Sequence, residues 1–484
     1  MFPGKLRLLK RKRITMHVQT DNLTSFIDPQ AIWSVLEKTT RPDEILVRET
    51  LAKASEKKGL SLFDAAVLLE NKDPELDLEI FDMARQVKQA TYGNRVVLFA
   101  PLYISNECAN QCTYCAFNAL NSELKRKTLT SEEIRREVQV LENSGQKRLL
   151  LVYGEHPRHD ARWIADTVAT VYDTLSDKSG SIRRVNVNCA PLDVAGFRLL
   201  HEAEIGTYQC FQETYHEPTY KKLHLKGNKS NYLWRLHAMH RAQEAGIDDV
   251  GIGALFGLYD HRFELLALLS HAQELEDKWG AGPHTISFPR LEPAQGSDIS
   301  VTPPYGISDH IFKKIVAITR LAAPYTGLIM STRESAELRT ELLHLGISQV
   351  SAASRTYPGA YSDPAWDRPD SQQFSIEDHR SLDEVVLDLV QQGLMPSWCT
   401  ACYRKGRTGE YFMTLAKDGF IQNFCHPNAV LTFNEYLNDY ASPTTLAAGR
   451  QCIARQLSGS SEKVKEQLEG LLARVDTGER DLYL

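Results

Sequence analysis

The chain carries, at residues 104–115, the segment Ile104-Ser105-Asn106-Glu107-Cys108-Ala109-Asn110-Gln111-Cys112-Thr113-Tyr114-Cys115. Its cysteines have the spacing C-x3-C-x2-C. An iron–sulfur cubane normally takes four cysteine thiolates, so three thiolates would leave one iron free for an outside ligand. Buried unligated thiols and a zinc site are the alternatives. Zinc takes four ligands, usually from two pairs, and this loop contains no histidine. The spacing therefore favours a cluster with one accessible iron.

The sequence around this segment predicts an α/β barrel over residues 95–352. Apolar runs of strand length alternate there with longer helical stretches. The predicted strands are Val96–Ile104, Arg148–Tyr153, Val185–Asn188, Thr207–Phe211, Val250–Phe256, Thr285–Phe288, Leu328–Ser331 and Ile347–Val350. Predicted helices between them include Ser131–Ser144, Trp163–Leu175, Leu233–Ala245, Arg262–Trp279 and Asp309–Leu321. Eight strands with intervening helices predict a complete (β/α)8 barrel of the TIM type.

Two regions flank the predicted barrel. Residues 28–94 place apolar side chains at helical spacing, with one helix start expected at Asp28-Pro29 and another near residues 40–43. Residues 353–484 predict a mostly helical domain that holds a second group of cysteines. Within it, residues 359–373 are rich in Pro, Asp, Ser and Gly and predict a loop, whereas residues 382–392 predict a helix.

The composition excludes several classes of protein. A net charge of −6 gives no electrostatic case for nucleic-acid binding. No run of about 20 apolar residues is present, so we expect no membrane span. Six of the nine cysteines fall into two close triplets, which is typical of metal ligation in a reducing compartment rather than of disulfides. We therefore expect a cytoplasmic protein.

Residues 1–27 predict a basic tail, in which Lys5, Arg7 and Lys10 are among the charged side chains. No apolar segment of a signal peptide follows them. Two interpretations stay open. Translation starts at Met16 rather than Met1, or the tail is a targeting segment that directs the chain to an organelle.

A three-thiolate loop after the first strand of a barrel resembles the loop of radical S-adenosylmethionine (SAM) enzymes. The resemblance implies that the amine and carboxylate of SAM chelate the accessible iron of a [4Fe–4S] cluster held by Cys108, Cys112 and Cys115. Cleavage of SAM then yields a 5′-deoxyadenosyl radical, so the cofactor supplies the difficult chemistry. Tyr114 fits this loop as well, because the resemblance implies that the side chain at its position packs on the adenine.

Active residues of such barrels lie at the carboxyl ends of the strands. Glu155 follows the second strand, where a carboxylate would accept the amine of SAM. Asn188 ends the third strand, and Gly251 and Gly253 lie in the fifth, where small residues let an adenine approach the backbone. Glu213, in the segment that closes the fourth strand, is a candidate catalytic residue. A purely structural role is the alternative for the asparagine and the glycines.

The second cysteine group consists of Cys399, Cys402 and Cys425, with the spacing C-x2-C-x22-C. It predicts a second iron–sulfur cluster or a structural zinc site. A zinc ion would need a fourth ligand, for which His426 and Cys452 are the candidates. Cysteines without a ligand are the third interpretation.

Five separated motifs are similar to those of the radical-SAM tyrosine lyases. They are Cys108–Cys115, Gly206–His216, His284–Arg290, Ser331–Glu334 and the C-terminal triplet. Two branches of that family are close, namely the 2-iminoacetate synthase of the thiamine pathway and the [FeFe]-hydrogenase maturase HydG. The C-terminal triplet matches the maturase branch. The similarity extends from about residue 30 to the end of the chain, and Ala116 departs from it, since a glycine is expected after the third cysteine.

This resemblance implies an activity. L-tyrosine would bind above the barrel beside SAM, and cleavage of its Cα–Cβ bond would give p-cresol and dehydroglycine. In the maturase branch, dehydroglycine reaches a second [4Fe–4S] cluster and yields CO and cyanide, which assemble on an additional "dangler" iron as an Fe(CO)(CN) unit for the hydrogenase. The implied partners are a flavodoxin-like or ferredoxin-like reductant and other hydrogenase maturation proteins. The alternatives are 2-iminoacetate synthase and, from another class, a non-enzymatic iron–sulfur carrier or scaffold.

Three residues are candidates for contacts with the substrate and SAM. A guanidinium is the expected partner of the tyrosine carboxylate, and Arg333, two residues past the seventh strand, is placed to provide it. Ser331 is expected on the same side as a hydroxyl donor. Arg290, at the end of the sixth strand, is the rival and would reach the carboxylate or ribose region of SAM. A salt bridge at the barrel mouth is the alternative for both arginines.

His284 is a candidate ligand for the additional iron. Side chains alternate along a strand, so His284, Ile286, Phe288 and Arg290 share one face. If that face points inward, six residues place His284 roughly 20 Å below Arg290, at the bottom of the barrel. The barrel would then serve as a conduit between the two cysteine groups. A satisfied core histidine is the alternative, and His271 is the rival ligand.

Overall fold

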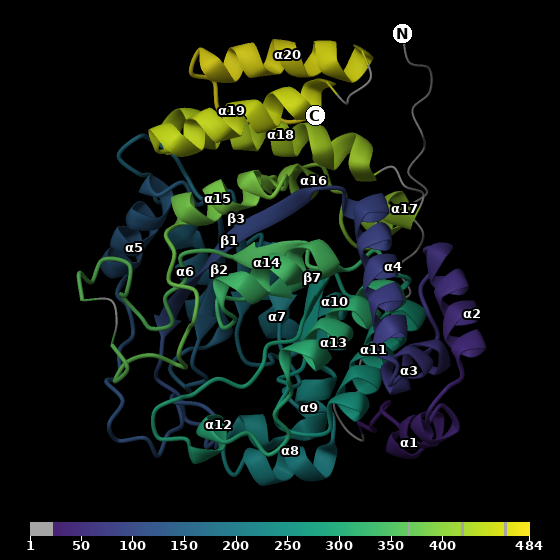
Figure 1. Cartoon of the computed structure of the whole chain (residues 1–484). Coiled ribbons are helices and arrows are strands. Elements are labelled where there is room, and N and C mark those ends of the chain that lie inside the picture. Colours follow the sequence, from purple (N-terminus) through teal and green to yellow (C-terminus); the bar gives the residue numbers. More distant parts are fainter. Residues whose placement is uncertain (1–22, 366–367, 418–420, 459–461) are drawn as a thin grey trace.

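The computed structural model describes residues 23–365, 368–417, 421–458 and 462–484 (Figure 1). Its centre is a closed parallel barrel in the strand order β2-β3-β4-β5-β6-β7-β8-β1, which the pairing of β1 with β2 completes. The strands are β1 (Arg95–Ser105), β2 (Arg148–Tyr153), β3 (Arg184–Asn188), β4 (Tyr208–Gln209), β5 (Val250–Gly253), β6 (Thr285–Ser287), β7 (Gly327–Met330) and β8 (Gln349–Ser351). The predicted eight-stranded barrel is confirmed.

Helices surround the barrel and connect its strands. They are α5 (Ser131–Asn143), α6 (Ala161–Tyr172), α7 (Val194–Glu202), α8 (Glu217–Leu223), α9 (Tyr232–Leu236), α10 (Ala238–Glu244), α11 (His261–Trp279), α12 (Asp298–Val301), α13 (Asp309–Ala322) and α14 (Ala336–Leu345), with the 3-10 turn η1 (Asn228–Ser230). Local sequence sets their starts. In α5, for example, the Thr130 hydroxyl accepts from the amide of Glu133, and the Glu133 carboxylate accepts from the amide of Thr130.

The helix expected over residues 233–245 is interrupted. It forms α9 and α10, with a break at His237, whose backbone leaves the helical region. The His237 ring instead contacts Phe26 at a centroid distance of 5.2 Å, and its Nε2 lies 2.8 Å from the carbonyl oxygen of Thr24. A tertiary contact with the N-terminal segment therefore overrides the local helical pattern.

The inner face of β6 differs from the expectation. Thr285 and Ser287 face the barrel interior, since Gln209 donates to the Thr285 hydroxyl across β5 and Ser287 lines the central cavity. Ile286 is fully buried in the outer core, and Phe288 contacts Phe312 of the surrounding helix α13. The condition that residues 284, 286, 288 and 290 all share an inward face therefore fails at Ile286, although Phe288 also lines the central cavity.

Helices also cover the outside of the barrel and one of its ends. The N-terminal helices α1 (Pro29–Lys38), α2 (Glu44–Ser55), α3 (Leu62–Glu70) and α4 (Pro74–Tyr92) lie along one side (Figure 1). Asp28 caps α1 as predicted, accepting from the amides of Gln30 and Ala31. The C-terminal helices are α15 (Leu382–Gln391), α16 (Ala401–Arg404), α17 (Gly409–Lys417), α18 (Ile421–Asp439), α19 (Pro443–Ser458) and α20 (Glu462–Asp476). Figure 1 shows α18, α19 and α20 stacked beyond the barrel end opposite to α8 and α12.

A ninth strand, which the sequence did not predict, joins the C-terminal region to the barrel. β9 (Met395–Ser397) pairs in parallel with residues 95–97 at the start of β1, and Cys399 follows it directly. Among the described residues, no helix is long and apolar enough to cross a membrane. The charged positions Lys5, Arg7 and Lys10 of the predicted tail, and Met16, lie outside the described residues.

Candidate active site and second cysteine centre

A large cavity lies at the carboxyl ends of the strands. The cavity has a volume of about 230 Å³. Most of the predicted site residues line it, from the first cysteine triplet to the loop after β7: Cys108, Cys112, Cys115, Tyr114, Glu155, Asn188, Glu213, Ser331 and Arg333.

The first cysteine triplet projects into this cavity from the loop after β1. Asn110 and Gln373 approach two of the sulfurs, with Nδ2 3.7 Å from Cys108 Sγ and Nε2 3.8 Å from Cys115 Sγ. Burial raises the pKa of the Cys112 thiol to about 12, so iron would have to displace its proton on binding. Such amide contacts suit thiolates that hold a cluster.

The spacing of the sulfurs bears on what the triplets can bind. In neither triplet do all three sulfurs lie within 4.8 Å of one another, although every cysteine of both triplets belongs to the described part of the chain. Thiolates about 2.3 Å from one zinc ion would be closer together than this limit. The arrangement therefore suits a polynuclear iron–sulfur centre better than a single zinc ion.

Two of the predicted SAM contacts, Glu155 after β2 and Tyr114 in the cysteine loop, are held in place by hydrogen bonds. Asn110 Nδ2 donates to Glu155 Oε2 at 2.6 Å, and the backbone amide of Ala109 donates to the Glu155 carbonyl at 2.8 Å. The Tyr114 hydroxyl lies 2.8 Å from His224 Nε2, which fixes the ring against the cysteine loop. The carboxylate of Glu155 and the ring of Tyr114 thus face the same cavity as the cysteines.

Glu213 occupies a strained position beside two cations that sequence reasoning did not single out. Its backbone φ is 70°, a left-handed conformation that disfavours residues other than glycine. Lys229 Nζ lies 2.7 Å from Glu213 Oε1, and Arg235 Nη2 lies 3.6 Å from the same oxygen. Burial by itself would raise the pKa of Glu213, but these two cations hold that pKa below its usual value. Glu213 is therefore an anion in the cavity.

The predicted tyrosine-binding residues line the cavity after β7, on the side of the first cysteine triplet, since Phe374 packs in the same cluster as Cys108 and Cys115. The Arg333 guanidinium stacks on the Phe374 ring, 3.4 Å from its centroid. Within the described part of the chain it forms no ion pair, so it is free to meet a ligand carboxylate. Ser331 lines the same wall, as does Glu292, whose pKa is raised to about 7 by burial and by Glu334. Glu292 was not predicted from the sequence, because it lies in a loop after β6 and belongs to no recognisable motif.

Three other predicted residues do not line the cavity. Arg290 pairs with Glu334 and, at 2.7 Å, with Asp309 on the rim, which is the salt bridge considered as its alternative. A side chain at Gly251 would approach Thr285 Oγ1 to 2.5 Å, and one at Gly253 would meet the carbonyl of Ser287. Close packing of β5 against its neighbours thus accounts for both glycines.

The second cysteine triplet surrounds a smaller cavity at the other end of the barrel. Cys399, Cys402 and Cys425 line it together with His284. His284 reaches this position because it lies just before β6, at the amino end of the strand. Cys452 is buried in α19 beside the Leu394 carbonyl, and neither it nor His426 lines the cavity. His271 lies elsewhere, with its Nδ1 2.9 Å from the Tyr215 hydroxyl.

Positive charge gathers around the second triplet. Arg95 and Arg148 line the cavity, and Arg148 Nη1 donates to the Cys399 carbonyl at 2.7 Å. Arg184 is fully buried nearby and donates to Asn186 at 3.0 Å and to Thr207 at 2.7 Å. A packed barrel would place branched aliphatic side chains there. Buried arginines beside three thiols favour the binding of an anionic centre.

The two cavities lie next to each other along the barrel axis. On four strands the smaller cavity is lined by one residue and the larger cavity by the residue two positions further: Val97 and Phe99, Arg148 and Leu150, Gly327 and Ile329, Gln349 and Ser351. Two residues of a strand span about 7 Å. Only one pleat of the barrel therefore separates the floors of the two cavities.

Comparisons with known proteins agree with this arrangement. Residues 102–270 match the model of the Radical SAM superfamily, and residues 287–395 match the Biotin and Thiamin Synthesis associated domain. The chain is 36% identical over 321 residues to 2-iminoacetate synthase of Escherichia coli (strain K12), covering 66% of this chain and 82% of that protein.

Two solved structures are similar over nearly the whole chain. A crystal structure of HydG, described as a maturase of the [FeFe]-hydrogenase, has a TM-score of 0.92 and 48% identity, and covers 95% of this chain and 100% of its own. The X-ray structure of HydG from Carboxydothermus hydrogenoformans has a TM-score of 0.80 and 43% identity, and the match covers 92% of this chain and 97% of that one.

Proposed function

Because this chain belongs to the radical SAM superfamily, we propose that it is a lyase that cleaves L-tyrosine and converts one product into CO and cyanide for an Fe(CO)(CN) unit. It is an enzyme of the group that includes 2-iminoacetate synthase and HydG. The [FeFe]-hydrogenase would receive the iron unit. The proposal includes p-cresol and dehydroglycine as the products of the first step.

One observation carries the maturase proposal. A barrel with a cysteine triplet in a cavity at each end, the two cavities one pleat apart, supports two reaction centres a short distance from each other. A product formed at the upper cavity would then reach the lower one through the barrel, by movement of the side chains of this pleat. A lyase that released its product for another enzyme would need only the upper centre.

The cofactor at the upper centre is a [4Fe–4S] cluster with SAM, which supplies a 5′-deoxyadenosyl radical when bound. Cys108, Cys112 and Cys115 would hold the cluster, and Glu155, positioned by Asn110, would accept the amine of SAM. Asn188 and Tyr114 would contact the nucleoside.

The substrate would bind at the part of the cavity wall that follows β7. Arg333 would form paired hydrogen bonds with the tyrosine carboxylate, because its guanidinium faces the cavity without an anionic partner among the described residues. Ser331 would donate to the same group. The anion of Glu213, held by Lys229, would face the substrate amine from which a hydrogen is abstracted.

At the lower centre, Cys399, Cys402 and Cys425 would hold a second [4Fe–4S] cluster, and His284 would bind the additional iron. The second candidate function is that of 2-iminoacetate synthase, which the similarity to the Escherichia coli enzyme favours. That similarity covers 66% of this chain, whereas the HydG structure covers 95%. The extra coverage supports the maturase branch.

The experiment that tests the proposal uses reconstituted, reduced protein with SAM and tyrosine. Formation of p-cresol, CO and cyanide supports the maturase function. Formation of p-cresol without CO identifies the protein as the simpler lyase. If the protein neither forms p-cresol nor cleaves SAM, the proposal fails and the non-enzymatic iron–sulfur carrier or scaffold is the function that remains.

A further inference from the structure

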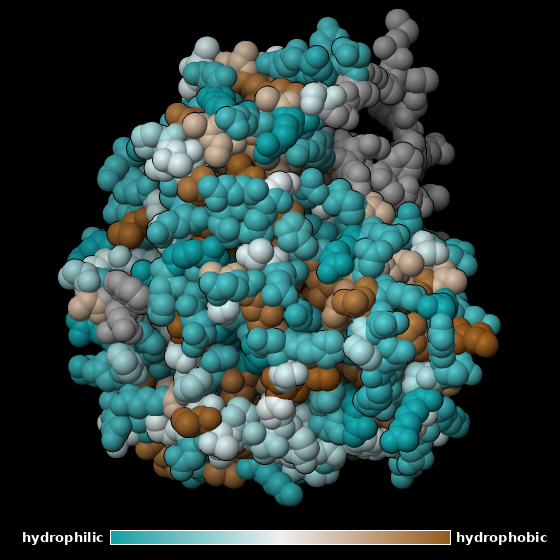
Figure 2. Space-filling model, in the orientation of Figure 1, coloured by the Kyte–Doolittle hydropathy of each residue, from teal (hydrophilic) through white to brown (hydrophobic). Residues whose placement is uncertain are grey.

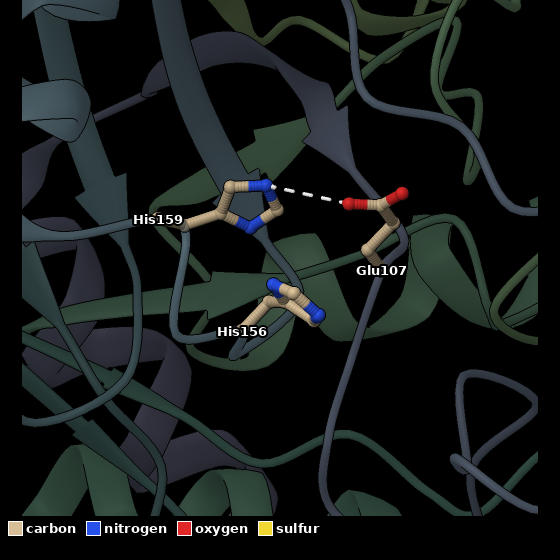
Figure 3. A group of neighbouring side chains, drawn as sticks. All are labelled: Glu107, His156 and His159. Carbon is tan, nitrogen blue, oxygen red and sulfur yellow. Dashed lines mark ion pairs between the residues drawn. The ribbon is translucent and has the colours of Figure 1, made fainter.

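A group of three side chains at the upper rim of the barrel lies outside both cysteine centres. Glu107, His156 and His159 each bring one ligand atom within 4.8 Å of the others (Figure 3). Glu107 comes from the loop after β1, immediately before Cys108, and the histidines come from the loop after β2. Among the described residues, no other group of histidine, cysteine or acidic side chains meets this distance.

The position of His159 is fixed by its surroundings. Its side chain is only 5% exposed, and its ring stacks on Trp163 with 4.3 Å between the centroids. Nε2 lies 3.7 Å from Glu107 Oε2 and 3.4 Å from the Thr128 hydroxyl, both long for hydrogen bonds, while Nδ1 makes no well-aligned hydrogen bond and the ring's backbone contact is with Gly154. This nearly buried imidazole is therefore oriented toward Glu107 without a strong interaction there.

Arg158 shows that the space between these ligands attracts a cation. Its Nη2 lies 2.7 Å from Glu107 Oε2, and its Nε lies 3.5 Å from His156 Nδ1. The Arg158 side chain is 69% exposed, so it can swing into solvent at little cost. One guanidinium thus makes contacts that a metal ion would replace with two shorter bonds.

We propose that Glu107, His156 and His159 form a binding site for a divalent first-row transition ion such as Zn²⁺. Two imidazoles and one carboxylate suit these ions and leave coordination positions for water. The bound ion would compete with Arg158 for Glu107. This site does not depend on the proposed lyase function.

Binding at this site would cross-link two loops that carry parts of the larger cavity. Glu107 adjoins Cys108, and His156 adjoins Glu155. The loops already touch, since a side chain at Gly154 would collide with the Glu107 carbonyl and the amide of Ala109 donates to Glu155. A metal ion would add a bond on the solvent side of this contact and restrain both loops.

The test measures Zn²⁺ binding to the reconstituted protein by titration calorimetry, with the iron content followed so that loss of a cluster is detected. We expect the wild type to bind one Zn²⁺ ion at this site. His156→Ala and Glu107→Gln should each lower the affinity for Zn²⁺ on the order of 100-fold. Arg158→Ala is the matched control, since it removes the competing cation. It should tighten binding by about two- to fivefold.

X-ray absorption at the zinc edge identifies the ligands. Nitrogen and oxygen neighbours at about 2.0–2.1 Å with imidazole scattering support the site, whereas sulfur at about 2.3 Å would place the zinc on cysteines and overturn it. Unchanged affinity in both ligand variants, or weaker binding in Arg158→Ala, would also overturn it. Hydrogen exchange of residues 106–109 and 154–159 should slow with Zn²⁺ in the wild type, and unchanged exchange would contradict the cross-link.

Discussion

The hydroxyl of Tyr403 lies 2.7 Å from Nε2 of His284, at the edge of the second cysteine centre. The only other polar contact of this imidazole with a described residue is that of Nδ1 with Asp249, at 3.5 Å. If His284 binds the additional iron through Nε2, the phenol of Tyr403 must move away. Substitutions of His284 and of Tyr403 therefore test this ligand separately: one removes the imidazole, and the other removes only its hydrogen-bond partner.

We expect His284→Ala to keep both clusters and to form p-cresol at the wild-type rate, but to lose the additional iron and most of the Fe(CO)(CN) product. An imidazole with an unprotonated nitrogen is a competent iron ligand. Tyr403→Phe frees Nε2 and should retain this iron. Iron analysis and infrared spectra of the product check both variants, with thermal melting as the control for folding. Full product yield in a stable His284→Ala variant would make His284 an ordinary core histidine.

Replacement of Cys108, Cys112 and Cys115 by Ala should abolish formation of 5′-deoxyadenosine. These cysteines line the larger cavity together with Glu155. Chromatography of the reduced reaction with SAM measures this product. SAM cleavage that persists in the triple variant would contradict the assignment of the cluster.

Replacement of Cys399 and Cys402 by Ser should remove the iron of one cluster and stop CO production, while tyrosine cleavage continues. The second triplet lies in a separate cavity, so the first centre keeps its ligands. Iron content, p-cresol and CO are measured on the same sample. An unchanged iron count would mean that the site holds another metal, with zinc the first to examine.

Arg333→Lys should raise the KM for tyrosine by roughly 10–100-fold, because an ammonium cannot form two parallel hydrogen bonds to a carboxylate. Arg290→Lys is the control, since Arg290 pairs with Glu334 and Asp309 and does not line the cavity. Its KM for tyrosine should match the wild type. Equal effects of the two substitutions would show that Arg333 acts on the fold and not on the substrate.

Glu292 predicts a dependence of stability on pH. Its pKa is raised to about 7 in the folded protein, first by burial and then by Glu334. Between about pH 4.3, the unfolded value, and pH 7, the folded chain holds a proton that the unfolded chain has lost, so stability falls as pH rises. Glu292→Gln removes this loss and should be about 1 kcal/mol more stable than the wild type at pH 8, after allowance for solvent screening. Urea unfolding of both proteins at pH 5 and pH 8 measures this difference in stability. If Glu292→Gln were more stable by the same amount at both pH values, titration of Glu292 would not be the cause.

Periodicity was sufficient to predict the barrel. Residues 148–153 form β2 with the predicted bounds, and strand-to-helix alternation placed the other strands within a few residues. The cysteine loop could be predicted because its spacing is a local pattern. β9 could not be predicted, since three residues that read Met-Pro-Ser become a strand only by pairing with β1.

The missed site residues share a physical reason. Lys229 lies in the 3-10 turn η1, Arg235 in the short helix α9 and Glu292 in a loop, and only the closed barrel brings them to the cavity. The inward face of β6 was assigned wrongly because His284 lies before the strand, where alternation no longer decides direction. A local pattern thus gives the elements, whereas the closure of the barrel decides which side chains meet.

The pairing of β9 with the start of β1 has a consequence for how this chain can change over generations. Val97 pairs with Ser397, two residues before Cys399, and β1 ends at Ser105, three residues before Cys108. The nine residues from Val97 to Ser105, whose ends lie about 26 Å apart, therefore link the two cysteine groups. An insertion in β1 would turn every later side chain to the opposite face. We expect homologous genes to tolerate insertions in the loops around both centres but none within this strand.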